Sequence, residues 1–144
     1  MTEKPGTIFG EGDTLTPVVC EVTQGRVDRY AKASGDFNPI HVDEKFAAGS
    51  HFGKRVAHGM LVAAQISEMM TQSFGHDWLR NGRLKLRFKA PVYPGDVVTS
   101  RGVVKSVNEV GGLKTVVCNV EVVRQTEEFA ITGEASVVIS GGRA

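Results

Sequence analysis

The pattern of apolar and polar positions begins with an irregular lead-in, rich in Gly, Thr and Pro, over residues 1–15. Residues 16–23 (TPVVCEVT) then have the short, Val- and Thr-rich composition of a strand. Apolar residues at helical spacing follow, and they predict a helix capped at its start by Thr23. Gly35 is suited to the position just after the last turn, where we expect this helix to end.

A segment that is apolar on nearly all sides occupies residues 57–75. Within 60–70 its polar side chains are Gln65, Ser67 and Glu68. A helix with this pattern is buried by its surroundings on most sides, and we expect it to end at Gly75. The stretch 41–50 before it has the pattern of a short helix.

The remainder of the chain has the pattern of antiparallel strands. Residues 82–90 (GRLKLRFKA) alternate strictly between apolar and basic side chains, and strand-like runs follow at about 96–107, 113–125 and 128–140. Gly111-Gly112 marks a hairpin between two of them. A buried helix followed by such strands predicts an α+β fold with the sheet wrapped around the helix. Dimerisation through an edge strand would protect the exposed edge of such a sheet.

Length and composition fit one domain over residues 1–144, with a tail at 141–144 that we expect to fray. A net charge of +1 provides no basic excess for nucleic-acid binding. No apolar run is long enough to cross a bilayer, and the N-terminus lacks the pattern of a secretory signal. Cys20 and Cys118 have no metal or redox spacing and are predicted to be inert, buried thiols. We therefore expect a cytoplasmic protein.

Several common functional motifs are incomplete or missing. GEGDTL (10–15) lacks the third glycine of a dinucleotide loop, and neither a G-x-S-x-G elbow nor a phosphate-binding P-loop occurs. The four histidines lack the spacing of a zinc site, and only His41 and Asp43 stand close enough to suggest metal ligands. We expect no metal.

SGDFNPIHVD (34–43) places Asp36 and His41 five positions apart, on either side of Asn38-Pro39. The proline disfavours helical geometry at Asn38 and predicts a tight turn. Taken singly, Asp36 is more simply explained as a turn residue and His41 as a hydrogen-bonded, partly buried histidine. Taken together, they are candidates for a general acid/base pair.

Four pieces in this order carry a resemblance to a known family. They are YAKASGDFNPIHVD (30–43), GKRVAHGML (53–61), the buried helix, and RFKAPVYPGD (87–96). Together they resemble the MaoC-like family of R-specific enoyl-CoA hydratases and dehydratases, also called the hydratase 2 group. The resemblance extends from about residue 20 to about residue 138, and it implies a homodimer with the hot-dog fold.

The resemblance also implies an activity and a set of site residues. Water would add to a trans-2-enoyl-CoA to give an (R)-3-hydroxyacyl-CoA, or the reverse, with Asp36 and His41 as the catalytic pair. The backbone N–H of Gly59 would bind the thioester oxygen, and Ser67 matches a position that supports the catalytic loop. Asn38 would orient that loop by bonding its own backbone. Coenzyme A enters as part of the substrate, so no separate cofactor is expected.

His58, next to Gly59, is interpreted as a helix-start residue that holds the loop of Asp36 and His41. Basic side chains on the alternating strand and before the helix are candidate contacts for the CoA phosphates, although an ordinary solvated strand face, or an edge charged against aggregation, is the simpler explanation. These candidates are Lys54, Arg55, Lys85, Arg87 and Lys89, with Arg83 in the same row.

Three alternatives to an enoyl-CoA hydratase remain open at this point. A 3-hydroxyacyl-ACP dehydratase of fatty-acid synthesis would present the same kind of thioester to the same pair. A hot-dog thioesterase would release free thiol, and the Asp/His pair around Asn-Pro argues against it. A non-catalytic subunit that binds acyl thioesters would be favoured by loss of Asp36 or His41, and the chain has both.

Overall fold

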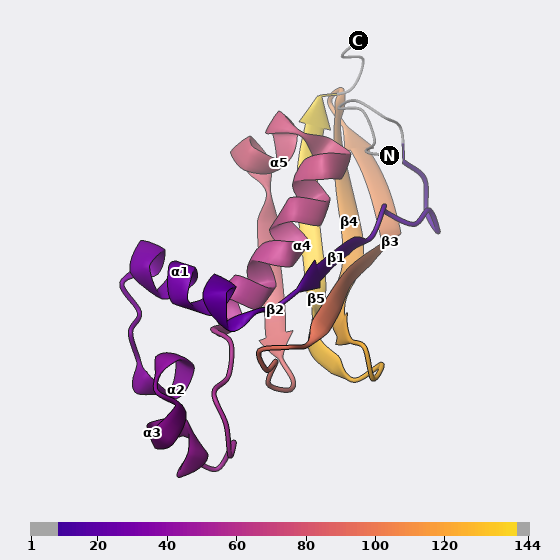
Figure 1. The fold of residues 1–144 in the computed structure, drawn as a ribbon. Helices are drawn as coiled ribbons and strands as arrows, with labels where there is room; N and C mark the ends of the chain where they lie inside the picture. The colour runs from indigo at the N-terminus through magenta and orange to yellow at the C-terminus, as the bar shows by residue number, and fades with distance from the viewer. Residues whose placement is uncertain (1–8, 141–144) are drawn as a thin grey trace.

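The computed structural model describes residues 9–140 and shows a five-stranded antiparallel sheet with one long helix across it (Figure 1). The strand order is β1-β3-β4-β5-β2. The strands are β1 (Val18–Glu21), β2 (Arg83–Phe88), β3 (Val97–Val110), β4 (Leu113–Arg124) and β5 (Phe129–Ser140). The helices are α1 (Gln24–Ser34), α2 (Pro39–Val42), α3 (Glu44–Ala48), α4 (Gly59–Phe74) and α5 (His76–Asn81). This is the α+β arrangement predicted from the sequence.

Helix α1 begins and ends where its capping residues predict. Thr23 Oγ1 accepts a hydrogen bond from the N–H of Arg26 at 3.1 Å, which satisfies one of the free donors of the first turn. Gly35 adopts a positive φ of 79° and donates its N–H to the carbonyl of Ala31 at the other end.

Helix α4 forms the core together with the inner face of the sheet. Ile66, Met69 and Met70 are completely buried on it, as the nearly all-apolar pattern predicts. Gly75 ends the helix at a positive φ of 59°. The Gly111-Gly112 hairpin between β3 and β4 is likewise confirmed, with both glycines at positive φ.

Three details differ from the predicted elements or add to them. The stretch 41–50 lies in two short helices, because the Asp43 carboxylate accepts a hydrogen bond from Phe46 N–H and starts α3 anew. Helix α5 was not predicted, because so short a helix shows no clear periodicity. In the lead-in, Phe9 and Leu15 are buried, while residues 1–8 and the predicted frayed tail lie outside the described residues.

Strand β2 lies at one edge of the sheet, where β5 is its only neighbouring strand within residues 9–140. Leu84 is 40% exposed and Phe88 is 56% exposed, so the described residues leave much of the apolar face of β2 uncovered. The basic side chains alternate with them and face outward. Lys85, for example, pairs in register with Glu134 on the outer face of β5.

Within residues 9–140, no helix is long and apolar enough to cross a membrane. Cys118 is buried in β4, and burial raises the pKa of its thiol to about 11, as expected for an inert side chain. Cys20 is only partly buried. The cytoplasmic location stays a prediction.

Candidate active site

The loop between α1 and α2 is organised by hydrogen bonds from its own side chains. Asn38 Oδ1 accepts from the N–H of Ile40 at 3.0 Å, and Pro39 occupies the first position of α2. The Asp36 carboxylate accepts from the N–H of Asn38 at 3.2 Å. Asn38 therefore bonds to its own backbone as expected, and Asp36 and His41 are held at the two ends of one short turn.

His41 is held from two sides. Its Nδ1 lies 2.8 Å from the carbonyl oxygen of Val56. Because a carbonyl only accepts, Nδ1 must carry a proton, and Nε2 of the neutral ring keeps its lone pair. Gln24 Nε2 also donates to the backbone carbonyl of His41 at 2.9 Å. The imidazole is thus fixed in the tautomer that a general base requires.

His58 connects the start of α4 to the catalytic loop. It is 2% exposed, and its Nε2 donates to the backbone carbonyl of Asp36 at 2.9 Å. Its ring stacks on the ring of His41, with centroids 3.8 Å apart and planes 25° apart. The interpretation of His58 as a residue that holds the loop is confirmed by these contacts.

Asp36, His41 and His58 line a cavity of about 280 Å³, which we call the acid/base cavity. A carboxylate oxygen of Asp36 and one nitrogen of each ring lie within 4.8 Å of one another. Gly59, at the start of α4, lines the same cavity. The first N–H groups of a helix have no partner within it, and the positive end of the helix dipole lies there. The cavity can therefore hold a water molecule beside an anion-stabilising donor.

The same three side chains do not form a good metal site, although they lie close together. The two imidazoles are stacked nearly parallel, so their in-plane lone pairs do not converge on one point. One nitrogen of each ring is also already bonded to a backbone carbonyl. Tetrahedral coordination requires ligands aimed at a common centre.

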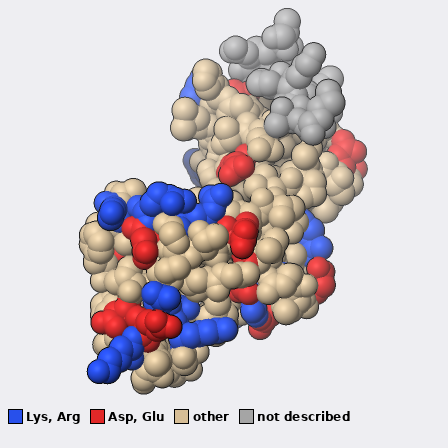
Figure 2. Space-filling view, in the orientation of Figure 1, with Lys and Arg blue, Asp and Glu red and all other residues tan. Residues whose placement is uncertain are grey.

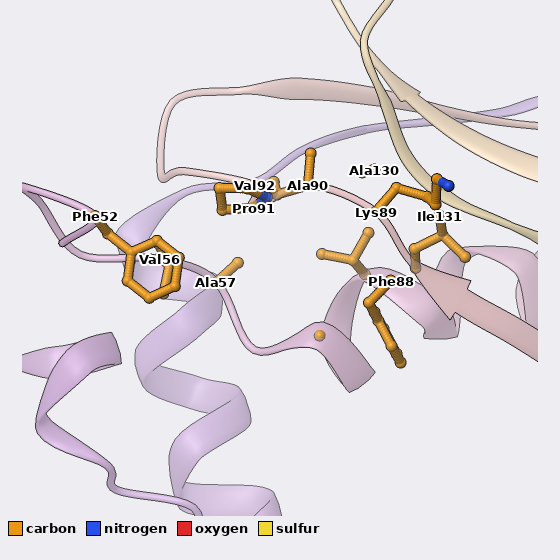
Figure 3. Close-up of a pocket in the computed structure, with 12 residues that line it drawn as sticks. Phe52, Val56, Ala57, Phe88, Lys89, Ala90, Pro91, Val92, Ala130 and Ile131 are labelled. Carbon is orange, nitrogen blue, oxygen red and sulfur yellow. The ribbon is translucent and has the colours of Figure 1, made fainter.

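A second cavity, of about 320 Å³, shares Phe88 and Gly59 with the acid/base cavity. Figure 3 shows the residues that line it. We call it the apolar cavity, because Lys89 is the one charged residue among the described residues that line it. Phe88 was not singled out from the sequence. Its place in the β2 alternation predicts an inward side chain, but nothing local shows that it lines two cavities.

Of the predicted phosphate contacts, not all lie at the two cavities. Lys89 lines the apolar cavity, and Lys54 Nζ lies 4.3 Å from the centroid of the Tyr93 ring. Lys85 and Arg87 lie on the outer face of β2, away from both cavities, because alternate strand residues face opposite ways. Figure 2 shows basic and acidic side chains interspersed over the visible face rather than gathered in one basic patch.

Ser67 does not contact the catalytic loop, which corrects the expectation for this residue. Its Oγ accepts a hydrogen bond from Trp78 Nε1 on α5 at 3.0 Å. Ser67 lies in the middle of α4, whereas the loop is held from the start of that helix by His58. Because α5 was not predicted, the sequence offered no partner for this hydroxyl.

Comparisons with known proteins agree with this architecture. A family model described as "MaoC like domain" matches residues 11–126. An (R)-specific enoyl-CoA hydratase of Aeromonas caviae is 37% identical over 112 residues, which are 77% of this chain and 81% of that protein. A 3-hydroxyacyl-thioester dehydratase Z of Mycobacterium tuberculosis is 32% identical over 110 residues, covering 74% of this chain and 70% of that protein.

Among solved structures, the (R)-hydratase from A. caviae involved in PHA biosynthesis superimposes with a TM-score of 0.78 at 30% identity. The match covers 90% of this chain and 96% of that one. The hot-dog fold expected from the sequence is thereby confirmed. The ChsH1-ChsH2 complex of M. tuberculosis, at 22% identity and a TM-score of 0.74, shares the fold.

Proposed function

Since the chain belongs to the MaoC-like domain family, we propose that it adds water reversibly to trans-2-enoyl thioesters, giving (R)-3-hydroxyacyl thioesters. One observation carries the proposal. Asp36 and the lone pair of His41 face a single cavity beside the start of α4. A hydro-lyase acting on a thioester needs a base for water and a donor for the carbonyl oxygen in this arrangement.

In the hydration direction, Asp36 and His41 together hold the water. Asp36 is the principal base and removes its proton, while the new O–C3 bond forms. The electrons of the C2=C3 bond move toward the thioester carbonyl, whose oxygen becomes enolate-like. The proton taken from water passes to Nε2 of His41, which delivers it to C2 and so completes the addition. A positioned acid/base group is typically worth about 10²–10⁴ in rate.

Gly59 supplies the stabilisation of the enolate-like oxygen through its backbone N–H at the positive end of α4. Losing one such donor typically costs about 10²–10³ in turnover. Asn38 supports the pair by capping α2. We propose that no further cofactor is needed, because these groups supply both proton transfers and the charge stabilisation.

We propose coenzyme A as the carrier, because the A. caviae relative that spans most of the chain is named an enoyl-CoA hydratase. An acyl carrier protein is the alternative, since a relative in Arabidopsis thaliana, 34% identical over 73 residues, is named a mitochondrial 3-hydroxyacyl-[acyl-carrier-protein] dehydratase. Both carriers present the same thioester through a pantetheine arm, so rates on matched CoA and carrier-protein substrates decide between them.

We also propose that the protein is a homodimer joined along β2. The outer edge of β2 has no neighbouring strand within the described residues, and Leu84 and Phe88 beside it are partly uncovered. A second copy pairing with this edge would satisfy its free backbone groups and cover these side chains.

The test of the proposed function follows loss of the enoyl-thioester absorbance of crotonyl-CoA and assigns the configuration of the product at C3. We expect the (R)-alcohol, and a fall in kcat of about a hundredfold or more for Asp36→Asn, the magnitude of a lost acid/base group. Asp43→Asn is the matched control. Asp43 caps α3, a few residues after the loop that holds Asp36, and an asparagine can accept the same hydrogen bond from Phe46 N–H.

The result that would overturn the assignment is equal turnover by Asp36→Asn and the wild type. Loss of activity in both asparagine variants would instead point to damage to the loop rather than to its chemistry. Absence of turnover by the wild type with both CoA and carrier-protein thioesters would favour a non-catalytic subunit.

A further inference from the structure

The outer face of β2 carries three cations in a row at the free edge of the sheet. Arg83, Lys85 and Arg87 are all exposed, and we call them the cation row. The apolar residues that alternate with them point to the other side of the sheet, where Leu86 packs against the core. The cation row therefore lies on the opposite face of the sheet from α4, and it lines neither cavity.

Little negative charge lies beside the cation row. The residues of β5 in register with its two arginines are Ser136 and Thr132, which are uncharged. Lys85 is in register with Glu134, but that carboxylate already accepts a hydrogen bond from Lys105 Nζ at 2.7 Å. Within residues 9–140 the cation row forms no ion pair. Its charges are therefore largely uncompensated.

Pairing of two β2 strands would bring two such rows together in any suitable register. Directly opposite residues of an antiparallel pair point to the same side of the sheet. Leu84 and Phe88 can be covered only if they lie opposite apolar residues of the second copy, so the cations must also lie opposite cations. The Cα atoms of opposite residues are about 5 Å apart, and like charges in this arrangement destabilise a sheet.

On the basis of the proposed dimer along β2, we propose that the two cation rows together bind one multivalent phosphate anion on the outer face of the sheet. Residues on one face of a strand repeat about every 7 Å, so each row extends for roughly 13 Å along its strand. Arginine binds phosphate through two parallel N–H···O bonds, and each copy contributes two arginines. The anion replaces repulsion between the rows with attraction to both.

The surrounding charges favour a compact anion over an extended one. Glu134 lies on β5, one strand in from the cation row of each copy, and Glu121 lies on β4 beyond it. An anion held between the two β2 strands avoids these carboxylates. A broad polyanion such as nucleic acid would lie against them. A short chain of phosphates, such as a triphosphate group, follows the line of the two rows.

The test measures binding of tripolyphosphate and of ATP to the substrate-free protein by calorimetry, at fixed ionic strength and without divalent cations. We expect one anion for every two chains, because the site exists only where two copies meet. The two ligands share the triphosphate group, so binding of either supports the site. The tighter binder identifies whether that group is free or attached to a nucleoside.

Variants of Arg87 separate charge from structure. Arg87→Gln removes two cations from each dimer and should weaken binding about tenfold, as expected for loss of a charge-assisted hydrogen bond. Arg87→Lys keeps the charge and should retain most of the affinity. Lys45→Gln is the matched control, because it removes the same charge from an exposed position on α3. Its affinity for the anion should equal that of the wild type.

An anion that binds only the dimer must also tighten the dimer. At a concentration about a hundred times its Kd, tripolyphosphate should lower the dissociation constant of the dimer about a hundredfold, measured by sedimentation against NaCl of equal ionic strength. Arg87→Gln should respond less than the wild type at the same concentration of the anion.

Three outcomes would overturn the proposal: one anion bound for each chain, equal affinity of Arg87→Gln and the wild type, or no binding of either anion by a dimeric wild type. Failure of the proposed dimer gives a different result, because the wild type would then sediment as a monomer in NaCl and in tripolyphosphate alike, which would remove the site as well. Failure of the proposed hydration would leave these measurements unchanged, since they contain no thioester.

Discussion

At the scale of single residues, two histidines determine the geometry of the candidate site. His41 keeps a free lone pair on Nε2 because its Nδ1–H donates to the backbone carbonyl of Val56, a residue fifteen positions away. His58 holds the Asp36 carbonyl from the start of α4 and stacks on His41. The acid, the base and the proposed oxyanion donor at Gly59 are thereby connected through one buried ring.

Gly59→Ala is expected to separate stability from activity. Alanine stabilises a helix relative to glycine by up to about 1 kcal/mol, so the thermal midpoint should stay the same or rise. The new Cβ would lie 2.9 Å from Phe88 Cε1 and must displace that ring. Because small displacements at a reacting centre are costly, we expect kcat/KM for crotonyl-CoA to fall about tenfold or more. An unchanged kcat/KM would contradict this role of the glycine.

Ser67→Ala tests the corrected position of this hydroxyl. Removing the acceptor of Trp78 Nε1 should lower the free energy of unfolding by about 1 kcal/mol. Turnover of crotonyl-CoA should be unchanged, because Ser67 bonds α5 and not the catalytic loop. Trp78→Phe should destabilise the Ser67→Ala variant less than it destabilises the wild type, since the two side chains share one hydrogen bond and that bond is already lost in the variant. A fall in kcat with stability intact would restore the role implied by the resemblance.

At the scale of the elements, Asp96 fixes the turn that leads from β2 into β3. Its carboxylate accepts hydrogen bonds at 2.8 Å from Arg124 Nε, from Gln125 Nε2 and from the N–H of Tyr93. Burial alone would raise the pKa of Asp96, but the bonds from Arg124, Gln125 and Tyr93 together outweigh it and hold the pKa below its ordinary value. The turn PVYPGD also contains Pro91 and Val92 of the apolar cavity.

Asp96→Asn is expected to lower the free energy of unfolding by about 3 kcal/mol at neutral pH. This is the lower end of the range for breaking a buried ion pair, because Arg124 still pairs with Glu128 in the variant. A lowered native pKa stabilises the fold at pH values above the unfolded pKa, near 4. This contribution is lost as pH falls through the native pKa. Urea unfolding should therefore show the gap between wild type and variant closing below about pH 4. A gap that is independent of pH would contradict the ionic role.

At the scale of the whole molecule, the outer edge of β2 has no neighbouring strand in the part of the chain that the structure describes. Leu84→Asp places a charge on the apolar side of this edge and should convert the proposed dimer to a monomer in light scattering. Leu113→Asp is the matched control, because Leu113 is similarly exposed, at 48% against 40%, but lies at the β3–β4 hairpin. Equal masses for both variants and the wild type would contradict assembly through β2.

Local rules were enough to predict most elements from the sequence. Thr23 and Gly35 set the ends of α1, the apolar run predicted α4, and strict alternation predicted β2. Their success has a common cause, since caps, periodicity and turn residues act over a few neighbouring positions. Asp43 shows the limit of this approach: its side chain divided a stretch that the pattern predicted as one short helix.

The sequence by itself determined the hot-dog fold, the family and the turn that holds Asp36 and His41, because each rests on short-range patterns and specific motifs. Only the tertiary structure decided which tautomer His41 adopts, and that Ser67 bonds Trp78. It alone placed Phe88 in the lining of both cavities. These features depend on contacts between segments distant along the chain, and the packing of the whole domain selects those contacts.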